Sequence, residues 1–295
     1  MPTEVIGGSV LSKLRRRARV TTLALLTATS LGLTACTGSG LGLGAAEANS
    51  VDAGLAGRID EAVSSAMTQS GSTAAIVGVW TGSAGDYVRA YGEGVAANAA
   101  IRGGQATQPV MCALLLELVD DGVVELDREV AQDVSRQVGI EGITYGQLCT
   151  GQSGLADFKG RISDIFVNNP TRPWSDRELL AHGLAHSPLP WPGLDVYQSD
   201  TAAVLLARAL HQVTGASIPE LLETHVFSKA DMPASSYPSE VLSDVTLPAG
   251  GLTGLTYPAA GGVPQCEVGV VEVPEVSPSM LGAAGATVTT VTDLK

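Results

Sequence analysis

Two glutamines, Gln105 and Gln108, are the first residues whose position suggests chemistry. They stand three residues apart, where a glycine-rich segment leads into an apolar stretch. This spacing places two side chains on the same face of a helix. An amide can donate and accept hydrogen bonds, but it cannot act as a nucleophile. The start of a buried helix that faces a cleft is a common place for a nucleophile, and neither glutamine can serve as one. The hydroxyl of Thr107, which lies between the two glutamines, is interpreted as a helix cap.

The helix that carries these glutamines is predicted within residues 101–122. Pro109 lacks a backbone N–H and fits best in a first helical turn, so we expect the helix to begin near residues 106–108. Gly122, after two aspartates, predicts a C-terminal cap. Apolar side chains form two adjacent rows with a spacing of four, which indicate a helix buried over most of its circumference. The rows are Val110, Leu114, Leu118 and Met111, Leu115, Val119.

Three cysteines lie beyond residue 36, namely Cys112, Cys149 and Cys266. Their odd number and their spacing match no metal-binding pattern. Cys112 lies within the apolar helix and Cys149 within an apolar turn, so small buried thiols are predicted in preference to a disulfide or a nucleophile. Cys112 also lies two turns deeper than Gln105, which is the wrong place to attack a substrate at the start of the helix.

Other candidate side chains give weaker signals. His182 and His186 have the spacing of some metal ligands, but no glutamate lies between them and no third ligand is evident. Solvent-facing histidines and no metal site are therefore predicted. Ser153 lies in the sequence GQSGL, where Leu155 replaces the second glycine of a nucleophile elbow. Trp191 fits either the wall of a cleft or packing within a loop.

The first 35 residues have the features of a lipoprotein signal peptide. Five basic residues are followed by an apolar segment at residues 20–33, which is too short to span a bilayer. Leu33-Thr34-Ala35-Cys36 resembles the lipobox of bacterial lipoproteins, whose cysteine is diacylated and becomes the new N-terminus. We expect residues 36–53 to be the lipidated Cys36 and a flexible tether. The protein would then be exported and anchored to the outer face of a bacterial membrane.

The charge of the chain restricts its partners. The 295 residues carry a net charge of −13. Without the five basic residues and Glu4 of the signal peptide, 12 Lys+Arg and 29 Asp+Glu remain, a net charge of about −17. Such a surface repels nucleic acid and anionic lipid headgroups, so we expect attachment to the membrane through the lipid alone. No nucleic-acid partner and no cofactor are expected.

Residues 54–295 are predicted to form the folded domain. An amphipathic helix is expected over residues 55–66. It is followed by an apolar strand at residues 73–80 and a second strand around residues 87–91, which together predict a β-hairpin.

The chain after the helix of the two glutamines is mostly helical. Ser175 with Glu178, and Ser217 with Glu220, have the spacing of capping boxes and predict helix starts. A further helix is expected over residues 200–215. This order predicts an α+β fold, in which an antiparallel sheet has flanking helices and a helical subdomain.

Five segments resemble, in order, the serine β-lactamase and D-Ala-D-Ala carboxypeptidase family, in its class C and esterase-like branch. The helix within residues 101–122 stands where that family has its nucleophile helix. ITYGQLCTGQSGL (residues 143–155) resembles the turn that usually ends His-Thr-Ser-Gly-Leu, and residues 191–215 resemble the segment with the Tyr-x-Asn motif. Residues 227–237 and 282–294 resemble its Pro-Leu-Gly-Met and Gly-Gly-x-x-Ser-Thr-x-x-Asp-Leu segments. The resemblance implies a β-lactamase/transpeptidase-like fold.

The resemblance also assigns roles by position. In that family, Ser-x-x-Lys supplies the nucleophile, and the lysine or the tyrosine of the second motif accepts its proton. The serine position is Gln105, the lysine position is Gln108, the tyrosine is Tyr197 and the asparagine position is Ser199. The third family motif, Lys or His with Ser/Thr-Gly, has no counterpart before Lys295. The resemblance therefore implies no intact catalytic residues, and these four side chains are the candidate ligand contacts.

Three hypotheses follow. The first is a lipid-anchored protein of this serine hydrolase family that has lost acyl transfer, and whose cleft binds a peptide or cell-wall fragment. The second is an active β-lactamase, DD-peptidase or esterase that uses an unconventional nucleophile such as Thr107 or Ser199. The third is a structural or partner-binding surface protein. The intact helices and caps favour the first over simple decay. Because the family adds further strands, we also expect a sheet that is incomplete at the C-terminus, with an exposed edge.

Overall fold

The computed structural model describes residues 47–186, 189–238, 247, 251–257, 259–260, 263–269, 271–272 and 276–295. The predicted signal peptide and Cys36 lie outside these residues. The described part belongs to one compact unit, Leu43–Lys295. None of the helices in the described ranges is long and apolar enough to cross a membrane.

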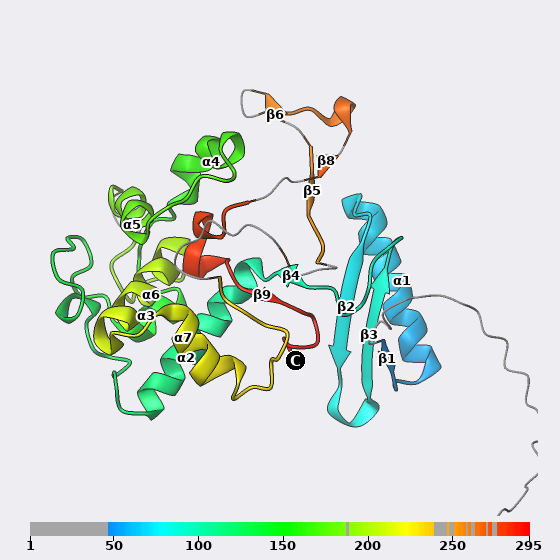
Figure 1. The fold of residues 1–295 in the computed structure, drawn as a ribbon, viewed down its shortest axis with the longest axis horizontal. Helices are drawn as coiled ribbons and strands as arrows, with labels where there is room; N and C mark the ends of the chain where they lie inside the picture. Colours follow the sequence, from blue (N-terminus) through cyan, green and yellow to red (C-terminus); the bar gives the residue numbers. More distant parts are fainter. Residues whose placement is uncertain are drawn as a thin grey trace, which may run out of the picture. The chain divides into compact units, whose positions relative to one another are not determined.

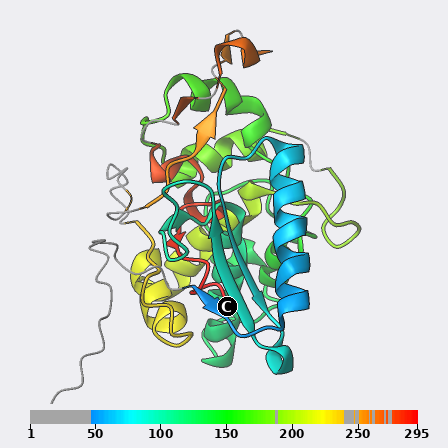
Figure 2. The same ribbon diagram turned by 90° about the vertical axis from the view of Figure 1, so that its right-hand side faces the viewer.

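The N-terminal part of this unit is a small antiparallel sheet covered by one helix (Figures 1 and 2). Its elements are β1 (Ala48–Asn49), α1 (Ala53–Ser70), β2 (Ala75–Trp80), η1 (Gly82–Ala84) and β3 (Asp86–Tyr91). The strand order is β1-β3-β2, and Val79 pairs with Tyr87. The predicted helix and β-hairpin are therefore confirmed. The helix begins after Asp52, whose side chain accepts a hydrogen bond from the Leu55 N–H, and it ends at Gly71 with φ of 69°.

Polar contacts also attach α1 to the sheet. The Asp60 carboxylate accepts hydrogen bonds from the Tyr87 hydroxyl at 2.5 Å and the Tyr91 hydroxyl at 2.7 Å, and it pairs with Arg89 at 3.0 Å. The hydrogen bond from Tyr87, with those from Tyr91 and Arg89, lowers the pKa of Asp60. The helix and β3 are thus joined through one ionised carboxylate.

The larger part of the unit is helical. Its helices are η2 (Gly104–Ala106), α2 (Thr107–Asp120), η3 (Val130–Gln132), α3 (Tyr145–Thr150), α4 (Lys159–Asn168), α5 (Asp176–Leu184), α6 (Asp200–Thr214), α7 (Ile218–Leu222), the π-helix η4 (Glu223–Phe227), η5 (Cys266–Val268), η6 (Pro278–Met280) and η7 (Gly282–Ala284). Its strands have two residues each, and are β4 (Ile101–Arg102), β5 (Leu255–Thr256), β6 (Ala259–Ala260), β7 (Val263–Pro264), β8 (Val271–Glu272) and β9 (Val288–Thr289). Together with the N-terminal sheet, these elements confirm the predicted α+β fold class.

The core is organised around α2 and α6, of which α6 is the more completely buried. Both predicted rows of α2 face this core, although Val119 is only partly buried. The helix begins and ends where Pro109 and Gly122 predicted. Gly122 has φ of 70°, a left-handed conformation that glycine adopts without strain, and its N–H donates to the Val119 carbonyl.

The starts of α5 and α7 are confirmed, but their capping boxes are incomplete. Ser175 and Ser217 each accept a hydrogen bond from the backbone N–H three residues later. The Glu178 side chain accepts a hydrogen bond from an arginine instead of returning to the start of its helix. A reciprocal box forms at the start of α3, between Thr144 and Gln147. The serine caps alone are therefore sufficient to set where α5 and α7 begin.

The prediction of buried thiols is wrong. Cys112 on α2 and Cys149 on α3 form a disulfide with a Cα–Cα distance of 5.7 Å. The third cysteine, Cys266, is free and exposed. The bond forms because α2 packs directly against α3, which places two residues separated by 37 positions side by side. The spacing of the two cysteines in the sequence gave no indication of that contact.

Candidate functional site

The segment that precedes α2 is held by the C-terminal residues of the described chain. β4 pairs with β9, and the Gly103 N–H donates to the Thr287 carbonyl at 2.7 Å. A Cβ atom at Gly103 would lie 2.5 Å from the Thr287 hydroxyl, so this close approach requires glycine. The arrangement leaves Gln105 exposed in η2 and places Gln108, which is partly buried, in the first turn of α2.

Thr107 does not cap α2, which corrects the sequence prediction. Ala106 occupies the N-cap position, and Thr107 is fully buried in the first turn. Its hydroxyl forms a hydrogen bond of 2.5 Å with the Thr287 hydroxyl and accepts another from the Thr287 N–H at 3.2 Å. Thr287 lies 180 residues away in the sequence, so no local pattern could indicate that it would use this hydroxyl.

Gln108 belongs to a charged network that was not predicted from the sequence. Its amide Nε2 donates to Asp200 Oδ1 at 2.9 Å, while Asp200 Oδ2 pairs with Lys159 Nζ at 2.8 Å. The Asp200 N–H donates to Asp157 Oδ2 at 3.1 Å. The Asp200 side chain is only 2% exposed, compared with 37% for Lys159. Gln108 is thus linked to Lys159 through a buried carboxylate.

Burial raises the pKa of the Asp200 carboxyl. The Lys159 ammonium opposes this shift, because a positive charge favours the ionised form, while the Asp157 carboxylate adds to it. Asp200 is the first residue of α6, where the positive end of the helix dipole also favours a negative charge. One feature of the sequence could have indicated this network. A helix was predicted to begin near Asp200, and an acidic residue is common in the first turn of a helix.

The other two predicted residues, Tyr197 and Ser199, occupy different environments. The Tyr197 side chain is exposed (42%), and its hydroxyl has no hydrogen-bond partner among the described residues. Its N–H donates to the Gly151 carbonyl at 2.8 Å. Ser199 is 5% exposed and its hydroxyl donates to the Ala156 carbonyl at 3.4 Å.

The structure therefore joins only part of the predicted site. Gln108 contacts Asp200, the residue that follows Ser199, whereas the side chains of Gln105 and Tyr197 remain open to solvent. Neither buried hydroxyl, that of Thr107 or that of Ser199, is hydrogen-bonded to a lysine, histidine or carboxylate. A hydroxyl nucleophile needs such a base within hydrogen-bond reach. This arrangement can donate hydrogen bonds to a ligand and accept them from it.

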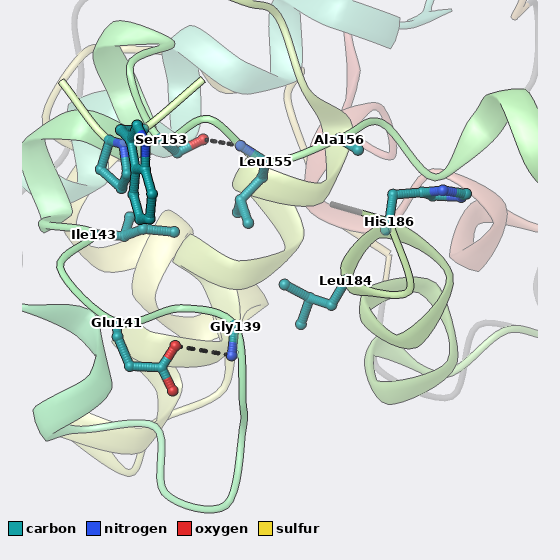
Figure 3. A pocket seen from close by; sticks show the side chains of 11 residues that line it. Gly139, Glu141, Ile143, Ser153, Leu155, Ala156, Leu184 and His186 are labelled. Carbon is teal, nitrogen blue, oxygen red and sulfur yellow. Dashed lines mark hydrogen bonds between the residues drawn. The ribbon is translucent and has the colours of Figure 1, made fainter. Parts of the chain in front are cut away.

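A separate cavity of about 290 Å³ is lined by Ser153 and Glu141, among other residues (Figure 3). The Ser153 hydroxyl accepts a hydrogen bond from the Leu155 N–H, and the Glu141 carboxylate accepts one from the Gly139 N–H. Both polar groups are therefore used by neighbouring backbone. Trp191, which is 75% exposed, also lines this cavity.

His182 on α5 and His186, which follows that helix, do not contact a common site. His182 packs edge-on against Trp174 at 6.2 Å, whereas His186 Nδ1 lies 3.2 Å from Arg161 Nη2. Both are partly buried, so the prediction of solvent-facing side chains holds only in part. Within the described residues, no group of three potential metal ligands is present.

Comparison with known proteins gives one family and a set of solved structures. Residues 59–295 match the family model described as Beta-lactamase. A D-stereospecific amidohydrolase from Streptomyces sp. is similar with 23% identity and a TM-score of 0.62, over 70% of this chain and 62% of that chain. The D-amino acid amidase from Ochrobactrum anthropi SV3, complexed with D-phenylalanine, has 20% identity and a TM-score of 0.64, over 81% of this chain and 67% of that chain.

A third similar structure is the octameric penicillin-binding protein homologue from Pyrococcus abyssi. It has 18% identity and a TM-score of 0.64, over 81% of this chain and 54% of that chain. At these identities the likeness concerns the fold. The chain spans only about half to two thirds of the length of these three proteins.

Proposed function

The chain belongs to the beta-lactamase family, and from this premise we propose that it is an exported, lipid-anchored member that binds a ligand in the family's cleft without acyl transfer. The observation that carries the proposal is a pair of amides at the start of α2, with Gln105 in η2 and Gln108 in the first turn of α2. Gln105 and Gln108 stand at the positions that the family's Ser-x-x-Lys motif assigns to the nucleophile and the lysine. Neither amide can attack a carbonyl carbon.

The surrounding contacts support a binding role. The Gln108 amide donates to Asp200, and the Lys159 ammonium pairs with the same carboxylate. The hydroxyls of Thr107 and Ser199 are buried and hydrogen-bonded to other groups. These contacts argue against an unconventional nucleophile at either position.

We propose a peptide that contains D-amino acids, such as a cell-wall fragment, as the ligand. Two of the similar structures are named as a D-stereospecific amidohydrolase and a D-amino acid amidase. The exposed side chains of Gln105 and Tyr197 would provide the contacts, since an amide can bond to a peptide group and a tyrosine offers both an apolar ring and a hydroxyl.

Intact mass measurement after exposure to a β-lactam and to a fluorophosphonate tests the loss of acyl transfer. The natural protein should show no adduct. A Gln105→Ser/Gln108→Lys variant should gain one, because it restores both positions on an otherwise intact first turn. A Gln105→Ala/Gln108→Lys variant, which lacks the new hydroxyl, is the matched control. An adduct on the natural protein would overturn the proposal, and its position would identify the nucleophile.

Binding and anchoring need their own measurements. Titration with a D-alanyl-D-alanine peptide should give saturable binding that weakens about tenfold in Tyr197→Ala, while an L-alanyl-L-alanine peptide should not compete. Equal binding of the two peptides would exclude stereospecific recognition.

Incorporation of a labelled fatty acid in a bacterial host should depend on Cys36, and labelling that persists in Cys36→Ser would contradict the lipid anchor.

A further inference from the structure

Three arginines line one pocket in the helical part, and none of its lining residues belongs to α2. The pocket has a volume of about 430 Å³ and is lined by Val134, Ser135, Arg136, Gln137, Arg177, Arg208 and Gln212. Arg136 lies in the loop after η3, Arg177 in the first turn of α5, and Arg208 on α6, so three separate segments supply the guanidinium groups (Figure 1). None of the lining residues is acidic.

These three arginines have no carboxylate partner among the described residues. Arg89, Arg128 and Arg172 each pair with an aspartate or glutamate. The chain has 30 acidic against 17 basic residues, so acidic partners are abundant. The Nε of Arg208 is also buried without any hydrogen-bond partner in the described residues. A buried donor without an acceptor is unfavourable unless a ligand or water supplies one.

We propose that this pocket binds a multiply charged oxyanion of the phosphate type. A guanidinium group presents several N–H donors in a plane and matches the oxygens of a phosphate group. A single carboxylate has too little negative charge and too few acceptor atoms for three guanidinium groups. A phosphate or pyrophosphate can bind all three together. The amides of Gln137 and Gln212 and the hydroxyl of Ser135 add neutral donors. The volume is within the usual range for small-molecule sites.

The backbone at Arg136 provides a variant that removes charge without endangering the fold. Arg136 has φ of 62°, a left-handed conformation that glycine adopts more easily than other residues. Arg136→Gly therefore suits the local backbone while it removes one guanidinium. Asp231, with φ of 54°, is exposed and offers a matched backbone control. Arg58→Gln on α1 is the control for loss of one positive charge outside the pocket.

Isothermal titration with pyrophosphate in buffer of low ionic strength tests the proposal. The natural protein should bind one pyrophosphate, and Arg136→Gly, Arg177→Gln and Arg208→Gln should each raise the Kd about tenfold or more. The two control variants, Arg58→Gln and Asp231→Gly, should change it less than about twofold. Absence of pyrophosphate binding at millimolar concentration together with absence of vesicle binding, or binding that the three pocket variants leave unchanged, would overturn the proposal.

A second arm distinguishes free phosphate from a phosphate carried by a lipid. Co-sedimentation is measured with phosphatidylglycerol vesicles and with phosphatidylcholine vesicles. Binding of pyrophosphate alone supports a soluble ligand. Binding of phosphatidylglycerol vesicles that Arg177→Gln and Arg208→Gln abolish supports the same pocket with a lipid headgroup as its ligand. Vesicle binding that survives these substitutions, without pyrophosphate binding, counts against the pocket.

Discussion

Replacing Lys159 by methionine should reveal how strongly the buried Asp200 carboxylate depends on its ammonium partner. Exposed ion pairs contribute about 0–1 kcal/mol to stability, whereas removal of one partner from a buried pair costs about 3–5 kcal/mol. Here the Asp200 side chain is 2% exposed and that of Lys159 is 37% exposed. We therefore expect Lys159→Met to lower the free energy of unfolding by about 2 kcal/mol near pH 7. This loss corresponds to a decrease of about 4–8 °C in Tm.

The pH dependence distinguishes an electrostatic effect from lost packing. Burial raises the pKa of Asp200 above its ordinary value of 3.8. The folded state therefore holds this proton more tightly than the unfolded state does, and Asp200 becomes destabilising as the pH rises through the raised pKa. Loss of Lys159 raises that pKa further. The destabilisation by Lys159→Met should thus be greatest near pH 7 and shrink as the pH falls toward about 4.

Urea unfolding at both pH values, followed by circular dichroism, measures this effect. Addition of Asp200→Asn to Lys159→Met removes the uncompensated charge and should recover most of the lost stability near pH 7. Lys229→Met is the control, because both members of its ion pair with Glu117 are more than a third exposed and should contribute less than about 1 kcal/mol. A loss in Lys159→Met that is equal at both pH values and unchanged by Asp200→Asn would refute the reasoning.

Two further predictions concern packing near the same helices, and urea unfolding measures both. The disulfide between Cys112 and Cys149 closes a segment of 37 residues, so Cys112→Ala/Cys149→Ala should lower the free energy of unfolding by about 4 kcal/mol; an unchanged stability would exclude the bond in solution. A Cβ at Gly183 on α5 would lie 2.3 Å from the Thr201 hydroxyl on α6, so Gly183→Ala should cost about 1–3 kcal/mol. Gly57→Ala on α1, with no atom within 4 Å of its Cβ, should instead stabilise by up to about 1 kcal/mol; equal effects of the two substitutions would contradict the packing argument.

The elements that could be predicted from sequence are those with local causes. Pro109 and Gly122 set the two ends of α2 because each restricts the backbone at its own position. The serines before α5 and α7 act over three residues. The β-hairpin follows from two apolar segments close together in the chain. Each of these signals lies within or directly beside the element that it determines, so it could be recognised from the local sequence.

The contacts that could not be predicted join distant parts of the chain. The Thr107 hydroxyl bonds to Thr287, and Gln108 reaches Lys159 only through Asp200. Cys112 meets Cys149 because two helices pack together. In each case, a residue judged by its neighbours in sequence has its real partner on another element. Gln108 and Ser199 were both candidate ligand contacts, and Gln108 reaches the residue that follows Ser199, but nothing in the sequence indicated the charge balance there.

The two proposed sites lie toward opposite ends of α6, and this separation makes their tests independent. Asp200 is at the first residue of the helix and Arg208 is eight residues later, which is about 12 Å along the axis. Substitutions farther apart than about 7–10 Å with no shared partner usually have additive effects. Lys159→Met should therefore leave pyrophosphate binding unchanged, and Arg208→Gln should leave peptide binding unchanged. If neither ligand bound to either variant, the common cause would be a displacement of α6. This helix is buried between Asp200 and Arg208, so a shift at one end would move the other end as well.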